Sequence, residues 1–267
     1  MKRKNFYREG PLAVVFLALL LMAGPASAQT PTAADADFDG NGVVDFADFL
    51  ALVDQFGARQ GDGRYDAKYD LDSDGAVGFG DFLSFTSYFG SVAIRDANLR
   101  AVIADSLDKA SSAPISREEM ASLTRLAATR KNISDLTGLE FATGLTDLYL
   151  YSNSISDVSA LSGLTNLTRL HLYSNSISDI SALSGLTNLT DLYLHSNSIS
   201  NVSALSGLTN LTVLGLSDNS ISDLSPLIAN TGLGSRDVVE VRNNPLSDTS
   251  LNTHIPALQG RGVWVQF

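Results

Sequence analysis

From residue 145 onwards, the hydrophobic positions of the chain recur every 22 residues in the pattern LxxLxLxxNxIxxxxxLxxLxx. Four copies follow it closely, and their pattern asparagines are Asn153, Asn175, Asn197 and Asn219. A fixed period of this length is typical of a solenoid, in which each repeat can bury its apolar side only against its neighbours. The pattern therefore predicts short parallel strands joined by tight helical turns, with the leucines in one continuous core.

The residues before the repeats, 91–122, have the apolar spacing of helices instead of the 22-residue pattern. A solenoid needs such an atypical end, because its first coil has no neighbour to cover it. Ile94, Leu99 and Ile103 lie on the predicted covering stripe. We therefore expect a helical N-terminal cap over 91–122 and repeats over 123–244.

The last pattern asparagine is Asn244, which follows the preceding one by 25 residues instead of 22. The three extra residues predict a loop between the last two repeats. Residues 245–267 are expected to form the C-terminal cap, in which Val263, Trp264 and Phe267 close the core.

Side chains alternate between the two faces of a strand, so each inward pair of leucines leaves outward positions beside it. If Leu148 and Leu150 point inward, residues 147, 149 and 151 point outward onto a concave sheet, as do their equivalents in the next two repeats. Neighbouring strands lie about 4.8 Å apart, which predicts two aromatic rows and one charged row across the sheet. These candidate partner-binding residues, here called the concave face, are Asp147, Tyr149, Tyr151, Arg169, His171, Tyr173, Asp191, Tyr193 and His195.

Exposed tyrosines on a rigid sheet are typical of a recognition surface. Structural alternatives stay open: an aromatic ladder that stabilises the strands by cross-strand contacts, and a surface ion network of little value. Recent duplication of the repeat also explains the tyrosines without selection for a ligand. The two histidines fall on different rows and are not spaced as a metal site.

The segment from residue 35 to 85 contains twelve aspartates against three basic residues, so it carries −9 of the chain's net charge of −11. So acidic a block needs either disorder or a cation. Its aspartates have a repeated spacing, in DFDGNGVVDFAD from Asp37 and in DLDSDGAVGFGD from Asp70. Oxygen donors at positions 1, 3, 5, 7 and 12 wrap one calcium ion, and the glycine at position 6 permits the sharp turn. Position 7 offers the backbone carbonyls of Val43 and Ala76.

An apolar stripe of helical period follows each loop and ends in Phe-Gly, at Phe56 and at Phe89. We expect these aromatic residues to pack the two helices against each other. A domain over 35–90 with so little core should need its calcium to fold. Residues 29–34 are expected to be a linker.

A loop followed by one helix, with Asp at position 12 and two near-copies, resembles a dockerin-type or EF-hand-like calcium repeat. The resemblance implies two Ca²⁺ ions and the side-chain ligands Asp37, Asp39, Asn41, Asp45, Asp48, Asp70, Asp72, Asp74 and Asp81. Position 9 of the second loop is Gly78, so we expect the second site to be the weaker one. In dockerins, positions 10 and 11 help to recognise a cohesin; here they are Phe46-Ala47 and Phe79-Gly80, without the hydroxyl residues common there.

The repeats, with SDISALSGLTNL as a typical segment, resemble the 22-residue leucine-rich repeats of internalin-like bacterial surface proteins. The resemblance implies an α/β leucine-rich-repeat solenoid with short parallel strands and a 3-10 or irregular convex side. A small all-α helix pair, the calcium segment, would precede it. The resemblance also favours a protein partner.

The chain opens with a basic start and an apolar run at 11–24, followed by Ala-Ser-Ala, which predicts a secretory signal peptide over 1–28. No second long apolar run follows, so we expect no membrane span after cleavage. The negative charge argues against nucleic-acid binding, and a chain without cysteine has no disulfides and no cysteine nucleophile.

No metalloprotease or serine-hydrolase motif is present, which argues against an enzyme. We therefore predict a secreted or cell-surface binding protein whose concave face recognises an extracellular protein or peptide, or a glycan. The alternative is a dockerin-type component that its calcium pair anchors in an extracellular assembly.

Overall fold

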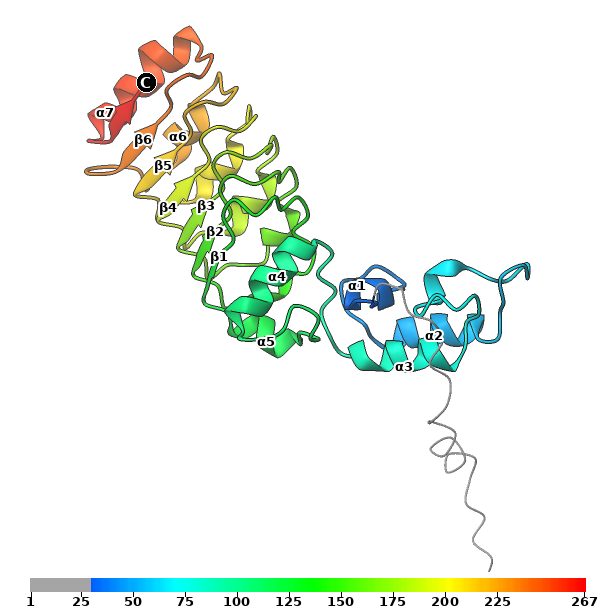
Figure 1. Ribbon diagram of the computed structural model, residues 1–267. Helices are drawn as coiled ribbons and strands as arrows, with labels where there is room; N and C mark the ends of the chain where they lie inside the picture. Colours follow the sequence, from blue (N-terminus) through cyan, green and yellow to red (C-terminus); the bar gives the residue numbers. More distant parts are fainter. Residues whose placement is uncertain (1–29) are drawn as a thin grey trace, which may run out of the picture. The chain divides into compact units, whose positions relative to one another are not determined.

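The structure is a computed structural model that describes residues 30–267, so the predicted signal peptide lies outside the described residues. Pro31–Phe267 form one compact unit, in which helices at the N-terminal end precede a sheet of short strands (Figure 1). None of the helices in the described part of the chain is long and apolar enough to cross a membrane.

The acidic segment contains short helices separated by its two loops. They are α1 (Ala33–Ala36), α2 (Phe46–Gln55), the 3-10 helix η3 (Ala67–Tyr69) and α3 (Phe79–Tyr88). The predicted helices after both loops are therefore present. The Asp45 carboxylate accepts a hydrogen bond from the amide of Ala47 and caps α2, which explains why the helix begins there.

Residues 31–90, here called the acidic module, have a small apolar core. Leu52 of α2 and Phe85 of α3 are fully buried in it. Ala33 is buried against the same core and begins α1, so the expectation of a linker over 29–34 is wrong at its C-terminal end. A residue that packs into the core is ordered with it.

The apolar stripes of the acidic module are only partly buried. Phe49 contacts Phe82 and Phe85, at ring-centroid distances of 6.3 and 6.2 Å, as expected for packed helices. The aromatic residues at the helix ends are only partly covered: Phe56 is 49% exposed, and Phe89 is 54% exposed although its ring lies 5.9 Å from that of Phe85. Phe56 and Phe89 are the C-cap residues of α2 and α3, so helical spacing no longer sets the direction of their side chains.

Two helices, α4 (Ala97–Ser106) and α5 (Arg117–Ser122), lie between the acidic module and the sheet. Leu99 and Ile103 of α4 are fully buried in the core of the repeats, as the predicted cap requires. The Ser116 hydroxyl accepts from the amide of Glu119, and the Glu119 carboxylate accepts from the amide of Ser116. This capping box fixes the start of α5.

Seven parallel strands of the described chain form one sheet in sequence order. They are β1 (Arg125–Ala127), β2 (Asp147–Tyr149), β3 (Arg169–His171), β4 (Asp191–Tyr193), β5 (Val213–Gly215), β6 (Val238–Glu240) and β7 (Trp264–Gln266). The segments that return the chain from strand to strand are the 3-10 helices η4 (Leu139–Phe141), η5 (Ser159–Leu161), η6 (Ser181–Gly185) and η7 (Ser203–Gly207), then α6 (Ser225–Ala229), the π-helix η8 (Ser250–His254) and α7 (Ile255–Gly260). This is the parallel sheet with a 3-10 opposite side that the repeat pattern predicts.

The pattern leucines fill the space between the sheet and the short helices, and all of them are buried. The pattern asparagines also turn inward. Asn175 donates to the carbonyls of Leu150 and Leu172 at 3.1 and 2.9 Å, and its Oδ1 accepts from the amide of Ile155 at 3.0 Å. Each asparagine thus satisfies backbone groups of its own coil and of the preceding one, so its role is structural.

The C-terminal cap differs from the prediction in its aromatic residues. Val263 is buried, but Trp264 and Phe267 are 62% and 61% exposed. Trp264 belongs to β7, which adds a seventh strand to the sheet, so alternation places Val265 inward and Trp264 outward. Ile255 and Leu258 of α7 cover the core instead.

Candidate functional site

The strand register brings the predicted concave-face residues into rows. Asp147 pairs with Arg169 and Tyr149 with His171 between β2 and β3, and β4 continues both rows. The central leucines of these strands are fully buried, whereas their outward neighbours are wholly or partly accessible. The inward and outward assignment made from the sequence is therefore confirmed.

The first aromatic row is Tyr149–His171–Tyr193. Its ring centroids lie 4.7 and 4.5 Å apart, and its rings meet at interplanar angles of 70° and 58°. Edge-to-face contacts of this kind place the positive edge of one ring against the negative face of the next.

The second aromatic row is Tyr151–Tyr173–His195, and its rings are stacked. Centroid distances are 4.4 and 4.3 Å, with interplanar angles of 7° and 14°. Because each inner ring face is covered by its neighbour, this row offers a ligand mainly the edges and hydroxyl groups of its tyrosines. Such groups donate and accept hydrogen bonds.

The charged row consists of Asp147, Arg169 and Asp191. Arg169 lies 3.0 Å from a carboxylate oxygen of Asp147 and 3.9 Å from one of Asp191. The arginine side chain is 53% exposed, so the network adds little stability and remains accessible to a partner.

Both histidines of the rows are half-buried under their tyrosine neighbours. Burial lowers the pKa of His171 and that of His195 below the usual 6.5, so both rings are neutral at pH 7. The Nδ1 atom of His195 is buried and has no hydrogen-bond partner among the described residues.

The structure adds Trp264, which sequence reasoning assigned to the C-terminal cap, to the outward face of the sheet. The charged row continues from Asp191 through Val213 and Val238 to Trp264, and so becomes apolar over β5 to β7. Gly215 lies beside Tyr193, where a Cβ atom would be 3.2 Å from the tyrosine ring. Alternation of side chains along the last strand would have predicted an outward Trp264, but the sequence analysis treated this segment as a cap and not as a strand.

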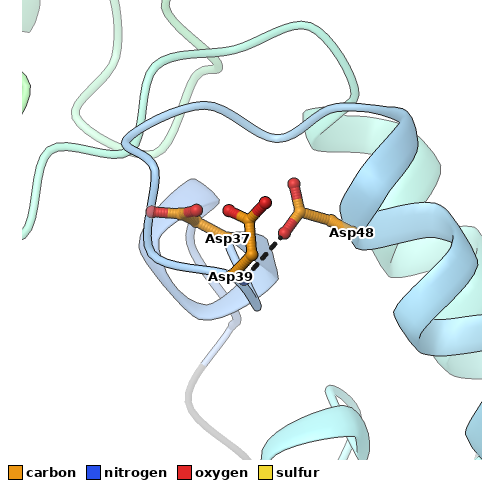
Figure 2. A group of neighbouring side chains, drawn as sticks. All are labelled: Asp37, Asp39 and Asp48. Atoms are coloured by element: carbon orange, nitrogen blue, oxygen red, sulfur yellow. Dashed lines mark hydrogen bonds between the residues drawn. The ribbon is translucent and has the colours of Figure 1, made fainter.

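The first acidic loop gathers three of its predicted ligands. Carboxylate oxygens of Asp37, Asp39 and Asp48 lie within 4.8 Å of one another, and Figure 2 shows the three side chains together. Asn41 donates to Asp39 at 3.0 Å. Asp45 is occupied by the cap of α2 and is not part of the group.

The second loop gathers Asp70, Asp72 and Asp74 in the same way, within 4.8 Å. Here the position-12 residue Asp81 stands apart and accepts hydrogen bonds from the amides of Asp72 and Gly78, at 3.2 and 2.6 Å. The two loops therefore bring together different parts of the same ligand pattern.

These residues fit a hard divalent cation such as Ca²⁺. The donors are carboxylate oxygens, the ligands that calcium prefers. The Asp37 side chain is fully buried, yet its Oδ1 accepts no hydrogen bond from the described residues. Burial raises the pKa of Asp37, that of Asp72 and that of Asp81, as expected for carboxylates removed from water without a full set of partners.

One Ser, His and Asp grouping occurs in the C-terminal cap, but its geometry does not suit nucleophilic catalysis. The Nδ1 atom of His254 is 3.4 Å from the Ser250 hydroxyl and 3.6 Å from an Asp223 carboxylate oxygen, so one nitrogen faces both groups. A triad needs the serine on one ring nitrogen and the carboxylate on the other. Ser250 is also fully buried and donates to the carbonyl of Ser222.

Comparison with known proteins agrees with the geometry of the sheet. The family model "Leucine Rich repeats (2 copies)" matches residues 143–185 and 187–229. A search of curated proteins found no match.

Among solved structures, an internalin (inlF) from Listeria monocytogenes is 30% identical with a TM-score of 0.52, over 64% of this chain and 55% of that one. The functional domain of InlJ from the same organism is 30% identical with a TM-score of 0.46, over 59% of this chain and 39% of that one. A Leptospira interrogans LRR protein is 22% identical with a TM-score of 0.49, over 56% of this chain and 38% of that one. The chain thus spans about half the length of the first internalin. Residues 143–185 and 187–229 are leucine-rich repeats, and the solenoid that contains them is similar in fold to an internalin.

Proposed function

We propose that the protein is a secreted, non-enzymatic binding protein whose concave face recognises an extracellular protein or peptide. The observation that carries the proposal is the pair of aromatic rows across β2 to β4, beside an accessible charged row. Tyrosine-rich surfaces held by a rigid backbone bind partners at a low entropic cost. The similarity of the repeat region to an internalin supports the same role.

The stacking of the second row favours a protein over a glycan. A sugar ring usually binds to the open face of an aromatic ring, but in Tyr151–Tyr173–His195 the inner faces are in contact with one another. What remains accessible is a line of ring edges and hydroxyls, with the Asp147–Arg169–Asp191 charges nearby. A peptide backbone and its polar side chains can match such a line with hydrogen bonds.

In this proposal, two calcium ions hold the acidic module in shape and take no part in chemistry. Asp37, Asp39 and Asp48 would hold one ion, and Asp70, Asp72 and Asp74 the other, with help from the remaining predicted ligands. Bound calcium supplies positive charge that offsets the repulsion among these carboxylates. Calcium affinity is then part of the folding free energy of the module.

The test is binding of the mature protein, in millimolar calcium, to arrays of extracellular proteins and of glycans. The triple variant Tyr149→Ala, Tyr173→Ala, Tyr193→Ala should lose its protein signals. The matched variant with Phe at the same three positions keeps the ring contacts but lacks the hydroxyls, and it should bind more weakly while melting like the wild type. Unchanged binding by a folded alanine variant would contradict the proposal, and signals on the glycan array alone would contradict the choice of ligand.

A second candidate function rests on the outer surface of the acidic module. Phe46 and Leu50 of α2 and Phe79 and Leu83 of α3 are exposed apolar residues at equivalent places in the two helices. Phe46 contacts Phe49 and Phe79 contacts Phe82, with centroids 5.7 and 6.1 Å apart, and Phe49 and Phe82 are themselves neighbours. A continuous apolar strip of this kind favours docking to another protein, in line with a dockerin-type role.

The two candidate functions can be separated in the same array experiment. Replacing Phe46 and Phe79 by Ser should remove signals that depend on the apolar strip and leave those of the concave face. Signals that disappear with a calcium chelator and with the double serine variant, but not with the tyrosine variants, would assign the function to the acidic module.

A further inference from the structure

The two acidic loops are near-copies, but they pair with different backbone segments. The second loop pairs with the segment that follows α2: Val77 donates to the carbonyl of Ala58 at 2.8 Å and accepts from the amide of Gly57 at 2.7 Å. The first loop pairs with the segment that follows α3: Val44 donates to the carbonyl of Ser91 at 3.0 Å and accepts from the amide of Gly90 at 2.7 Å. Each loop is thus hydrogen-bonded to the segment that follows the helix of the other loop.

The consequence of this exchange differs for the two loops. The segment after α2 continues into the exposed connection 59–64, which belongs to the acidic module itself. The segment after α3 runs directly into the cap of the solenoid. Val92 donates to the carbonyl of Ile115 at 2.7 Å, and Ser91 forms a β-bridge with Ser116, the N-cap of α5. Residues 91–92 therefore connect the first loop to the start of α5 through backbone hydrogen bonds and isolated β-bridges.

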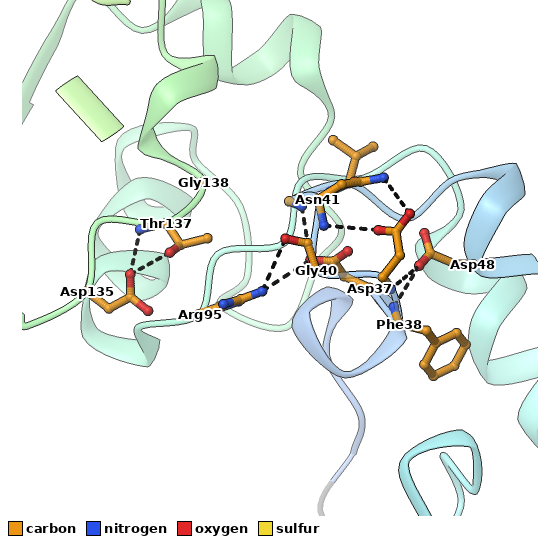
Figure 3. A network of polar contacts seen from close by, with 12 residues as sticks. Asp37, Phe38, Gly40, Asn41, Asp48, Arg95, Asp135, Thr137 and Gly138 are labelled. Atoms are coloured by element: carbon orange, nitrogen blue, oxygen red, sulfur yellow. Dashed lines mark hydrogen bonds and ion pairs between the residues drawn. The ribbon is translucent and has the colours of Figure 1, made fainter. Parts of the chain in front are cut away.

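Side chains of the solenoid also reach the first loop directly. Gly42, at φ +89°, lies so close to η4 that a Cβ would be 3.2 Å from Glu140 Oε1 and 3.3 Å from the Phe141 ring. Arg95 donates to the carbonyl of Gly40 at 3.4 Å and lies 3.9 Å from Asp37 Oδ2 (Figure 3). In the part of the chain that the structure describes, the equivalent glycine of the second loop contacts only its own module: a Cβ on Gly75 would meet Gln60 alone.

The first loop also has an unmet requirement for positive charge at this junction. Asp37 Oδ1 is buried and has no hydrogen-bond partner within residues 30–267, and it lies beside the carboxylates of Asp39 and Asp48 (Figure 2). In the second loop, by contrast, the equivalent residue Asp70 accepts from the Tyr65 hydroxyl at 2.6 Å and from the amides of Asp74 and Gly75. A cation in the first loop would pair with Asp37 Oδ1, the atom that the described residues leave unsatisfied.

We propose that the first loop is a cation-dependent clamp between the acidic module and the solenoid. The clamp rests on the proposed calcium binding. A cation bound in the first loop stabilises residues 91–93, the cap at 115–116 and the first coil at 138–141. Occupancy of the second loop stabilises only the acidic module. The calcium concentration then determines whether the acidic module is held rigidly or loosely against the solenoid that contains the concave face.

Hydrogen exchange on the full chain, with and without calcium, tests the clamp. Asp39→Asn and Asp72→Asn remove one charge at position 3 of the first and of the second loop, so they are a matched pair. In the wild type, amides at 91–93 and 115–116 should exchange roughly 100-fold more slowly at a calcium concentration 100-fold above Kd, since opening must release the ion. Asp39→Asn should lose this protection, and Asp72→Asn should keep it.

Calorimetric calcium titration of the same samples distinguishes the failure of the clamp from the failure of the calcium proposal. No calcium binding by the wild type would overturn both. Two bound ions without calcium-dependent protection at 115–116 would overturn the clamp alone, as would equal loss of protection in the two variants. Phe141→Ala provides an independent check, because it leaves every ligand in place: it should still bind two ions, with reduced protection at 138–141.

Discussion

The acidic module and the leucine-rich-repeat solenoid rely on opposite chemistry. The module has a small core around Leu52 and Phe85, and it concentrates carboxylates that repel one another. The solenoid has a continuous core of leucine and isoleucine, and asparagines such as Asn175 satisfy backbone groups beside it. We infer that the module depends on what it binds, whereas the solenoid depends only on its own side chains. The stability of the module and that of the solenoid can therefore be perturbed separately.

Removal of calcium should have the largest effect, and it should be confined to the module and its junction. A ligand present at 1,000 times its Kd stabilises by about 4.1 kcal/mol, which is comparable to the whole stability of so small a unit. With EGTA, the exposure of Phe49 and Phe85 should increase and proteolysis should cut within 31–90. Circular dichroism should still show a cooperative melt of the repeats. A module that resists protease equally in EGTA would contradict this difference between the two regions.

A cavity in the solenoid should have the next largest effect, and it should not depend on calcium. Leu170→Ala removes a fully buried side chain from the centre of β3, which should cost about 2–5 kcal/mol of unfolding free energy. Leu83→Ala, at a leucine that is 41% exposed on α3, is the matched control and should cost no more than about 0.5 kcal/mol. Urea unfolding followed by circular dichroism measures both. A calcium-dependent cost for Leu170→Ala would mean that the two regions fold as one.

The solenoid was largely predictable from sequence because its period carries both the core and the exposed face. Once Leu148 and Leu150 are placed inward, the alternation of a strand fixes Tyr149 outward, and the 22-residue offset fixes His171 beside it. The inward role of Asn175 follows from the same period. Each of these inferences needs only local geometry that every repeat shares.

What the sequence could not predict lies where that period ends. The sequence analysis places Trp264 in the cap that closes the core, but β7 pairs with β6 in register and turns the ring outward. The helix ends at Phe56 and Phe89 follow helical spacing without being buried, because spacing does not report how far a small core extends. The contacts of Arg95 with the first loop join residues more than fifty positions apart, and no pattern signals them.

Loss of a pattern asparagine should have a smaller effect than a core cavity, but a larger one than the loss of a surface asparagine. Asn175→Ala leaves the amide of Ile155 and the carbonyls of Leu150 and Leu172 without their side-chain partner, and an unsatisfied buried group costs about 1–3 kcal/mol. Asn188→Ala removes an exposed hydrogen bond to the carbonyl of Thr165 and should cost about 0.5 kcal/mol or less. Thermal melting of the two variants compares them directly. Equal costs would show that water replaces the buried amide.

The smallest expected effect is a pH dependence that belongs to the solenoid and not to the calcium ligands. Burial lowers the pKa of His171 and that of His195, so the folded state binds fewer protons than the unfolded state just below pH 6.5. Their contribution is therefore fully present above the unfolded pKa of 6.5 and is lost as the pH falls through the lower, folded pKa values.

Melting of the aromatic rows, followed by near-ultraviolet circular dichroism between pH 7.5 and 5.5, measures this loss. The double variant His171→Gln, His195→Gln should have a flat profile over that range, because nothing replaces the two titrating rings. A slope that survives in the double variant would place the titrating groups outside the aromatic rows.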